Sequence, residues 1–149
     1  MLSIPDKNLN IPLQYACALP NNQGMDLVKF MLHSFCTLAR TKQFYQVLTH
    51  RDITGACAFH HALMGNSFQI LSLLFKFWVT HIHADSSLSM IDKMKQNPFI
   101  QQNWHGHTPF HSAIVEEKLD TLESFLLTYE PTKEEAPFFF HFDVDLCID

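Results

Sequence analysis

The sequence predicts an all-α fold in which three similar helix pairs stack side by side. The first observation is a repeat: residues 52–63 (DITGACAFHHAL) align without a gap on residues 103–114 (NWHGHTPFHSAI). Such units stack because each leaves an apolar face that only a neighbour covers. The second is composition, since 47% hydrophobic and 17% charged residues are typical of a folded chain. The third is helical spacing after the second copy, where apolar residues recur every three or four positions at Phe68, Leu71, Leu74, Phe75, Trp78, Val79 and Ile82.

The first helix of each pair is expected directly after the repeated turn. Residues 6–17 (DKNLNIPLQYAC) form a more divergent first copy of this pattern. Pro12 and Pro109 suit the first position of a helix, because the missing N–H costs no hydrogen bond there. Thr108 is expected to cap the helix of the third copy and to meet the imidazole of His111 one turn later.

Extra residues separate the three copies, whose equivalent positions are 46 and 51 residues apart. Residues 41–49 have the apolar spacing of a short helix. Residues 88–96 form a second candidate helix, with a cap at residues 85–87 and a stop at Pro98. The sequence therefore predicts long outer helices, each followed by an additional short helix.

The repeated segments resemble the ankyrin-repeat family, whose units carry a turn, the motif Thr-Pro-Leu-His-x-Ala and two antiparallel helices. Residues 108–113 (TPFHSA) carry this motif almost unchanged, and residues 57–62 (CAFHHA) and 11–16 (IPLQYA) are more divergent copies. The copy spacing exceeds the family's unit of about 33 residues, so extended outer helices are expected. The resemblance implies one domain over residues 1–149, a helix-turn-helix solenoid with repeats at about 6–50, 52–101 and 103–130.

Residues 131–149 differ in kind from the repeats. From Phe140 to Leu146 apolar and polar residues alternate, a period typical of an extended strand. We expect this acidic, aromatic C-terminal segment to cap the open apolar edge of the last repeat. The alternatives are a strand that adds to the sheet of a partner protein and a natural protein that continues beyond Asp149.

Charge and hydropathy argue against two kinds of partner. The net charge of −5 equals that of residues 130–149, where six acidic residues face one lysine. Arginine occurs only at positions 40 and 51, so no basic stripe is available to neutralise the phosphates of a nucleic acid. No apolar run reaches the roughly 20 residues that span a bilayer, and no secretory signal is visible at the N-terminus.

Cysteine and histidine offer two chemical alternatives. No two of the four cysteines form a Cys-x-x-Cys pair, which favours free thiols in a reducing compartment. Cys57 lies three residues before His60, a spacing compatible with a thiol nucleophile and its base. The resemblance instead makes both of them structural residues of a turn. His105, His107 and His111 lack a fourth metal ligand at the expected spacing. We expect no enzyme, no metal and no cofactor; an atypical enzyme or metal-binding protein is the least favoured alternative.

Phenylalanine is expected to form much of the core. Phe59 and Phe110, at equivalent positions of two copies, should be buried between neighbouring helix pairs. Trp104 belongs to no helical stripe, because it lies in the turn of the third copy; it is displayed to a partner unless an insertion folds over it. The phenylalanines assigned to buried positions are Phe30, Phe35, Phe59, Phe68, Phe75, Phe110 and Phe125.

By the resemblance, a partner protein binds the concave face, which combines the tips of the turns with the outward positions of the inner helices. Lys7, Ile53 and Trp104 occupy equivalent places on successive turns and are expected to form a row. The residues assigned to this face are Lys7, Asn8, Asn10, Ile53, Thr54, Ala56, Met64, Trp104, His105, His107, Val115 and Glu116.

The function expected from this resemblance is non-enzymatic binding of another protein by a chain that is monomeric on its own. Short, divergent arrays of this kind are similar to effectors that intracellular bacteria or viruses place in host cytoplasm, where they block or redirect a host protein. The alternative is a fragment or subunit of a larger cytosolic scaffold or regulatory protein. Both interpretations place the chain in cytoplasm.

Overall fold

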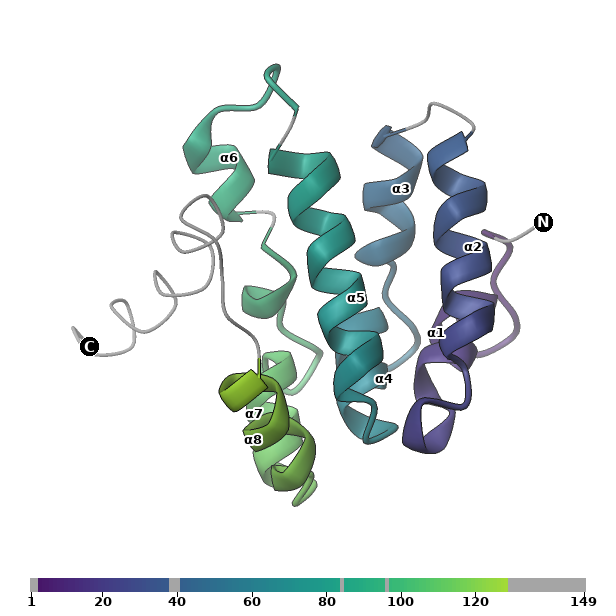
Figure 1. Ribbon diagram of the computed structural model, residues 1–149, viewed down its shortest axis with the longest axis vertical. Coiled ribbons are helices and arrows are strands. Elements are labelled where there is room, and N and C mark those ends of the chain that lie inside the picture. Colours follow the sequence, from purple (N-terminus) through teal and green to yellow (C-terminus); the bar gives the residue numbers. More distant parts are fainter. Residues whose placement is uncertain (1–2, 38–40, 84, 96, 129–149) are drawn as a thin grey trace.

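The computed structural model describes residues 3–37, 41–83, 85–95 and 97–128 (Figure 1), and over these ranges it contains helices and turns but no strand. The fold class is therefore all-α. Each helix in these ranges is too short or too polar to cross a membrane. The cap or strand predicted for residues 131–149 lies outside the described residues. The elements are α1 (Pro12–Ala18), η1 (Pro20–Asn22), α2 (Met25–Thr37), α3 (Thr41–Leu48), α4 (Ala58–Met64), α5 (Phe68–Trp78), η2 (Val79–His83), α6 (Met90–Lys95), η3 (Pro98–Ile100), α7 (Pro109–Val115) and α8 (Leu119–Thr128).

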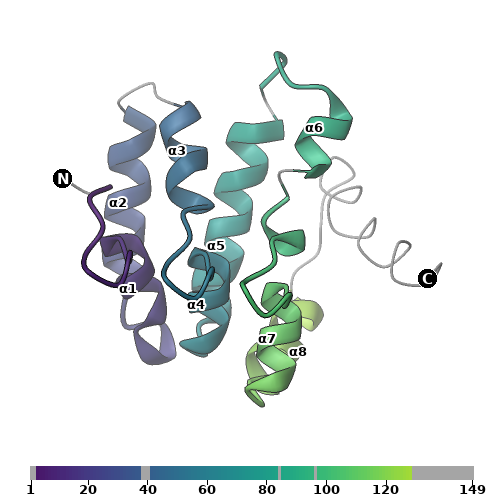
Figure 2. The same cartoon turned by 180° about the vertical axis from the view of Figure 1, so that it is seen from behind.

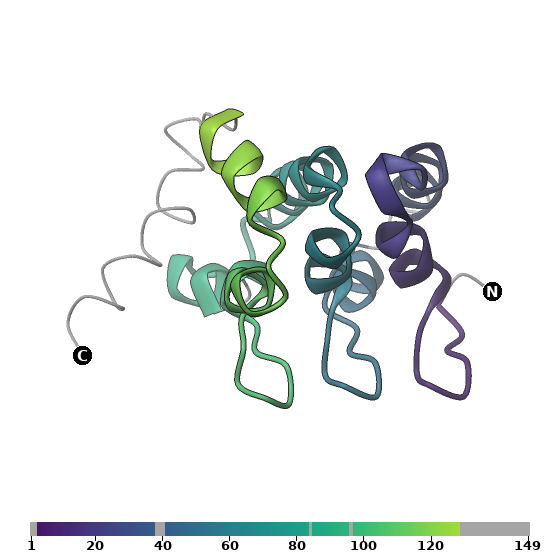
Figure 3. The same cartoon turned by 90° about the horizontal axis from the view of Figure 1, so that it is seen from below.

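The helices form two rows, and three turns project from one of them. Figure 3 shows α1, α4 and α7 side by side in the row next to the turns, with α2, α5 and α8 in a second row behind. Within the first row, α1 contacts α4 and α4 contacts α7. Each helix of this row also packs against the helix that follows it in the second row.

Small buried side chains recur at one position of the first row of helices. Ala16, Ala62 and Ala113 occupy equivalent places in α1, α4 and α7, and all three are buried. A methyl side chain lets neighbouring helices approach closely, which a larger residue would prevent. The face of α5 that helical spacing predicted to be apolar is buried, with Trp78 fully enclosed.

Two inserted segments extend the first row of helices. In Figure 2, α3 lies above α4 and α6 lies above α7. α2 has 13 residues, whereas α1 has seven, so part of α2 extends beyond its partner. α3 contacts both α2 and α5, and thereby covers apolar surface that the shorter helices leave bare. The additional short helices expected after the outer helices are present after α2 and α5; the residues that follow α8 lie outside the described ranges.

The second inserted helix begins later than the sequence indicates. Helix α6 begins at Met90 rather than at residue 88. The hydroxyl of Ser89 accepts a hydrogen bond from the backbone N–H of Asp92 (3.1 Å), so Ser89 supplies the cap. The cap predicted at residues 85–87 is instead a separate turn, in which the Asp85 carboxylate accepts from the N–H of Ser87 (2.9 Å).

Phe99 is the centre of the core between the second and third helix pairs. It belongs to η3 and is 1% exposed. Its ring lies 5.3 Å from that of Phe59 on α4 and 4.8 Å from that of Phe75 on α5, measured between centroids. The rings of Phe110 and Phe125, on α7 and α8, lie at 4.8 and 5.7 Å. One residue of an inserted segment therefore joins four helices.

Phe30 is an error in the predicted core, because its side chain is 67% exposed. It lies on α2 in the first pair, and no earlier pair exists among the described residues to cover it. Phe59 is fully buried, as expected, but Phe110 is only partly buried, since no fourth pair follows α7 in the described chain. Of the other predicted core residues, Phe75 and Phe125 are buried, and Phe35 and Phe68 are half-buried.

Candidate protein-binding surface

Each of the three turns is closed by one side-chain oxygen. Oδ1 of Asp52 accepts hydrogen bonds from the backbone N–H groups of Thr54 (2.8 Å) and Ala56 (3.1 Å). This arrangement fixes the backbone of the turn through its first residue, and the hydroxyl of Thr54 at the tip also donates to Oδ1 of Asp52 (2.6 Å). The other two turns repeat the pattern: Asn8 and Asn10 donate to Asp6, and His105 and His107 donate to Asn103.

Each turn also contains one residue with a positive φ angle. Gly55 and Gly106 adopt φ angles of 80° and 77°, which glycine reaches without strain. Leu9 occupies the equivalent place in the first turn with φ of 61°, a left-handed conformation that is unfavourable for a residue with a Cβ atom. The backbone geometry of the turn is therefore kept even where the sequence departs from glycine.

The tips of the turns are hydrogen-bonded to one another. The N–H of Ile53 donates to the carbonyl of Asn8 (2.9 Å), and the N–H of Trp104 donates to the carbonyl of Thr54 (3.0 Å). Figure 3 shows the resulting row of three projecting loops. The turns that carry Lys7, Ile53 and Trp104 therefore lie side by side in the expected order.

His60 ties the second helix pair to the third turn. Its Nδ1 accepts from the N–H of Cys57 (3.2 Å), so the proton lies on Nε2, which donates to the carbonyl of His107 (3.0 Å). Burial lowers the pKa of His60 to about 4, although the bond to His107 opposes this effect. His60 is therefore neutral near pH 7. In the third copy, Nδ1 of His111 lies 2.7 Å from the hydroxyl of Thr108, which caps α7.

A groove lies between the second and third turns and the helices α4 and α7; we call it the inner groove. Its cavity has a volume of about 580 Å³. Seven residues predicted for the binding face line it: Thr54, Ala56, Met64, His105, His107, Val115 and Glu116. Five further residues line it that were not predicted to bind: Asp52, His60, His61, Asn103 and Ser112.

The remaining predicted residues lie outside the inner groove. Lys7, Asn8 and Asn10 belong to the first turn, which does not line this cavity. Ile53 and Trp104 are exposed at their tips, with 59% and 66% of their surface accessible. The predicted face thus divides into the inner groove and a row of tips beside it.

Asp52 and His61 form a hydrogen-bonded pair in the inner groove that sequence reasoning missed. Nε2 of His61 lies 2.8 Å from Oδ2 of Asp52. Burial by itself raises the pKa of Asp52, but hydrogen bonds from Thr54 and His61 outweigh it, and the net effect lowers that pKa. In the sequence, Asp52 is recognisable only as the first residue of the turn, and its second role of orienting His61 gives no separate signal.

Trp104 is exposed at its tip and also packs against its own protein. The indole lies over Gly55 of the preceding turn, so close that a Cβ atom there would lie 2.6 Å from Cδ2 of the indole. The guanidinium carbon of Arg51 is 5.5 Å from the centroid of the ring. No inserted segment buries Trp104, and much of the indole remains accessible.

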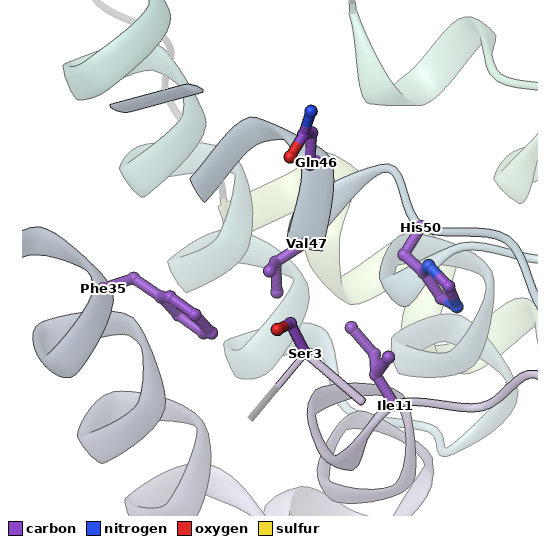
Figure 4. Close-up of a pocket in the computed structure, with 6 residues that line it drawn as sticks. All are labelled: Ser3, Ile11, Phe35, Gln46, Val47 and His50. Atoms are coloured by element: carbon purple, nitrogen blue, oxygen red, sulfur yellow. The ribbon is translucent and has the colours of Figure 1, made fainter. Parts of the chain in front are cut away.

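Two further cavities lie beside the inserted segments. Figure 4 shows one of about 410 Å³, in which Phe35, Val47 and Ile11 meet the polar residues Ser3, Gln46 and His50. The other has a volume of about 600 Å³, and we call it the insertion-side cavity. Its lining comprises Arg51, Lys95, Ile100, Gln101, Gln102, Asn103 and Trp104.

The Cys57–His60 pair has the wrong chemistry for a nucleophile and base. Sγ of Cys57 lies 3.2 Å from Nδ1 of His60. However, Cys57 is 1% exposed, and burial raises the pKa of its thiol. A reactive cysteine needs a lowered pKa and access for its substrate. Within the described residues, no group of three or more histidine, cysteine or acidic side chains is placed to hold a metal ion.

Comparison with known proteins does not assign the chain to a family. No protein-family model matches the chain, and no curated protein matches it at a significant level.

Proposed function

We propose that this chain is a divergent ankyrin-like repeat protein that binds a partner protein, without catalysis, through the inner groove and the row of turn tips. The observation that supports the assignment best is the hydrogen-bond pattern of the turns. Three segments distant in sequence share one closing oxygen, one positive φ angle and one register of bonds between tips. This agreement supports one repeated unit in all three segments.

The shape and composition of the inner groove suit an extended segment of a partner. Its walls are a row of turns on one side and two helices on the other. Met64 and Val115 supply apolar surface, being 38% and 60% exposed. His105 and Glu116 supply polar groups at the rim, as in other protein interfaces with an apolar centre.

The lack of catalysis is proposed from the state of the ionisable groups. The thiol of Cys57 is buried with a raised pKa, and burial lowers the pKa of His60, whose two ring nitrogens are both hydrogen-bonded within the protein. The carboxylate of Asp52 is engaged by its own turn and by His61. Each group thus has a structural task. The further prediction that the partner is a host protein, met in host cytoplasm, rests on the resemblance to effectors.

Site-specific crosslinking tests the proposed surface. A photoreactive amino acid replaces Met64 or Val115 in the full chain, and lysate from candidate host cells supplies the partner. Lys76, which is exposed on α5 in the second row, is the matched control position. We expect one protein to be crosslinked from both groove positions and not from position 76. Crosslinks of equal yield from position 76, or from that position alone, would contradict the proposal.

A further inference from the structure

The insertion-side cavity contains positive charge that no described acid neutralises. Arg51 and Lys95 line it, and the described part of its lining contains no carboxylate. Among the described residues, no carboxylate lies within ion-pair distance of either cation. The inner groove differs, because Asp52 and Glu116 are part of its lining. In a chain with a net charge of −5, this cavity is thus a local cationic site.

Arg51 is held in one orientation by neutral acceptors. Its Nη1 donates to the carbonyls of Gly55 (3.3 Å) and Gln102, and its Nη2 donates to Oε1 of Gln101 (3.0 Å). A guanidinium has five N–H bonds, so two remain without an acceptor among the described residues. A pre-oriented guanidinium loses little entropy on binding a carboxylate, which makes it a favourable anchor.

Trp104 places an apolar surface beside this cation. Its indole lines the insertion-side cavity and is 66% exposed. Its contacts with Arg51 and Gly55 fix the plane of the ring. An occupant that matches both features carries a carboxylate next to an aromatic or aliphatic side chain.

We propose that the insertion-side cavity binds an acidic segment of a partner protein, with an Asp or Glu carboxylate at Arg51 and Lys95 and an adjacent apolar side chain on Trp104. This inference rests on the proposed function, and it adds the chemistry of the partner. It also gives the inserted segment a task in recognition, because α6 supplies Lys95. The partner then contacts both sides of the third turn.

Selection of short random peptides against the full chain tests this inference. We expect the selected peptides to carry Asp or Glu beside an apolar residue. Each peptide is then compared with its counterpart in which Asp is replaced by Asn and Glu by Gln. The acidic form should bind about ten-fold more tightly, and added salt should reduce the difference, because the anchor is a charge pair.

Variants of the chain locate the binding site. Lys95→Gln should weaken the acidic peptides about five-fold, and Arg51→Gln should weaken them about ten-fold or more. Lys76→Gln makes the same charge change on α5 and should leave their affinity unchanged. Because Arg51 also bonds to the turns, thermal unfolding accompanies each measurement. If Arg51→Gln does not fold, Arg51→Lys and the exposed Lys95 still test the proposal.

Four results would overturn the inference. The first is that substitution of Arg51 and Lys95 leaves the affinity for acidic peptides unchanged. The second is that the selection yields no peptide. The third is a set of peptides without acidic preference that depends on Met64 and Val115, a result that leaves the proposed function intact. The fourth is acidic-peptide binding that appears only after the acids of residues 130–149 are replaced by amides, which would assign the cavity to the chain's own segment.

Discussion

At the scale of single residues, Gln14 and His60 make equivalent bonds with different chemistry. Oε1 of Gln14 accepts from the N–H of Ile11 (2.9 Å), and Nε2 donates to the carbonyl of Ala56 (3.0 Å) in the second turn. His60 uses Nδ1 and Nε2 in the same two ways toward its own helix start and the third turn. A neutral imidazole offers one acceptor and one donor, whereas the amide offers an acceptor oxygen and two N–H donors, the second of which Gln14 gives to the carbonyl of His50 (3.0 Å). Only the imidazole responds to pH.

His60 should make folding sensitive to mild acid. Its pKa is about 4 in the folded protein, because it is buried, against an ordinary value of 6.5. The unfolded chain therefore binds the proton first as pH falls, so stability decreases between about pH 6.5 and 4, by at most about 3 kcal/mol. The free energy of unfolding, measured with denaturant across this range, checks the prediction.

The variant His60→Gln isolates this effect, since Gln14 shows that glutamine fits the position. We expect the variant to fold at pH 7 and to lose that part of the pH dependence. The converse variant, Gln14→His, should add a comparable dependence from the first copy. An unchanged slope in His60→Gln would show that other groups cause the acid sensitivity.

Leu9 offers a second test of the equivalence of the turns. Its φ of 61° is strained for leucine, whereas Gly106 adopts 77° in the same place. Leu9→Gly relieves this strain but costs the extra conformational entropy that glycine loses on folding. The net effect should stabilise the protein by about 0.5–1 kcal/mol. Gly106→Ala should destabilise by about 1 kcal/mol through strain alone, because an added Cβ there meets no atom within 4 Å. Denaturant unfolding measures both; lower stability of Leu9→Gly would contradict the assignment.

At the scale of elements, periodic segments were predictable and an aperiodic one was not. Helical spacing indicated α3 and the stripe of α5, because an amphipathic helix repeats its apolar residues in sequence. Phe99 gave no such signal: it follows Pro98 in a short turn, and its four aromatic neighbours come from distant segments. For Phe30 the error is the reverse: its position in the helix predicted a buried side chain, but burial there requires a neighbouring helix pair.

Phe99 should contribute more to stability than any exposed phenylalanine. It is fully enclosed by rings from α4, α5, α7 and α8. Phe99→Ala leaves a cavity between two helix pairs and should cost about 3–5 kcal/mol in the free energy of unfolding. Phe30→Ala, at a position 67% exposed, is the matched control and should change it by less than about 0.5 kcal/mol. Equal effects in chemical denaturation would refute the central role of Phe99.

At the scale of the whole molecule, the candidate site was predictable where the repeat determines it. Thr54 and His105 occupy equivalent positions in the second and third copies, so the repeat predicted that both lie on the same face. The contact between Asp52 and His61 was not predicted, because the sequence already explains Asp52 as the first residue of a turn and His61 as a residue of a helix. The insertion-side cavity could not be predicted, because Arg51 and Lys95 are brought together by an inserted segment that has no counterpart in the repeat.

Trp104 matters at all three scales, because its indole packs on Gly55 and Arg51 and yet 66% of its surface remains exposed. Trp104→Ala should weaken binding of the partner by about 2 kcal/mol or more, the usual threshold for a hot spot. Loss of the contact with Arg51 should lower the free energy of unfolding by only about 1 kcal/mol. Ile53→Ala, at the equivalent tip and 59% exposed, is the control for general effects of truncating a tip. Calorimetric binding and denaturant unfolding separate the two roles: a large loss of stability with unchanged affinity would make Trp104 a structural residue and leave the inner groove alone to recognise the partner.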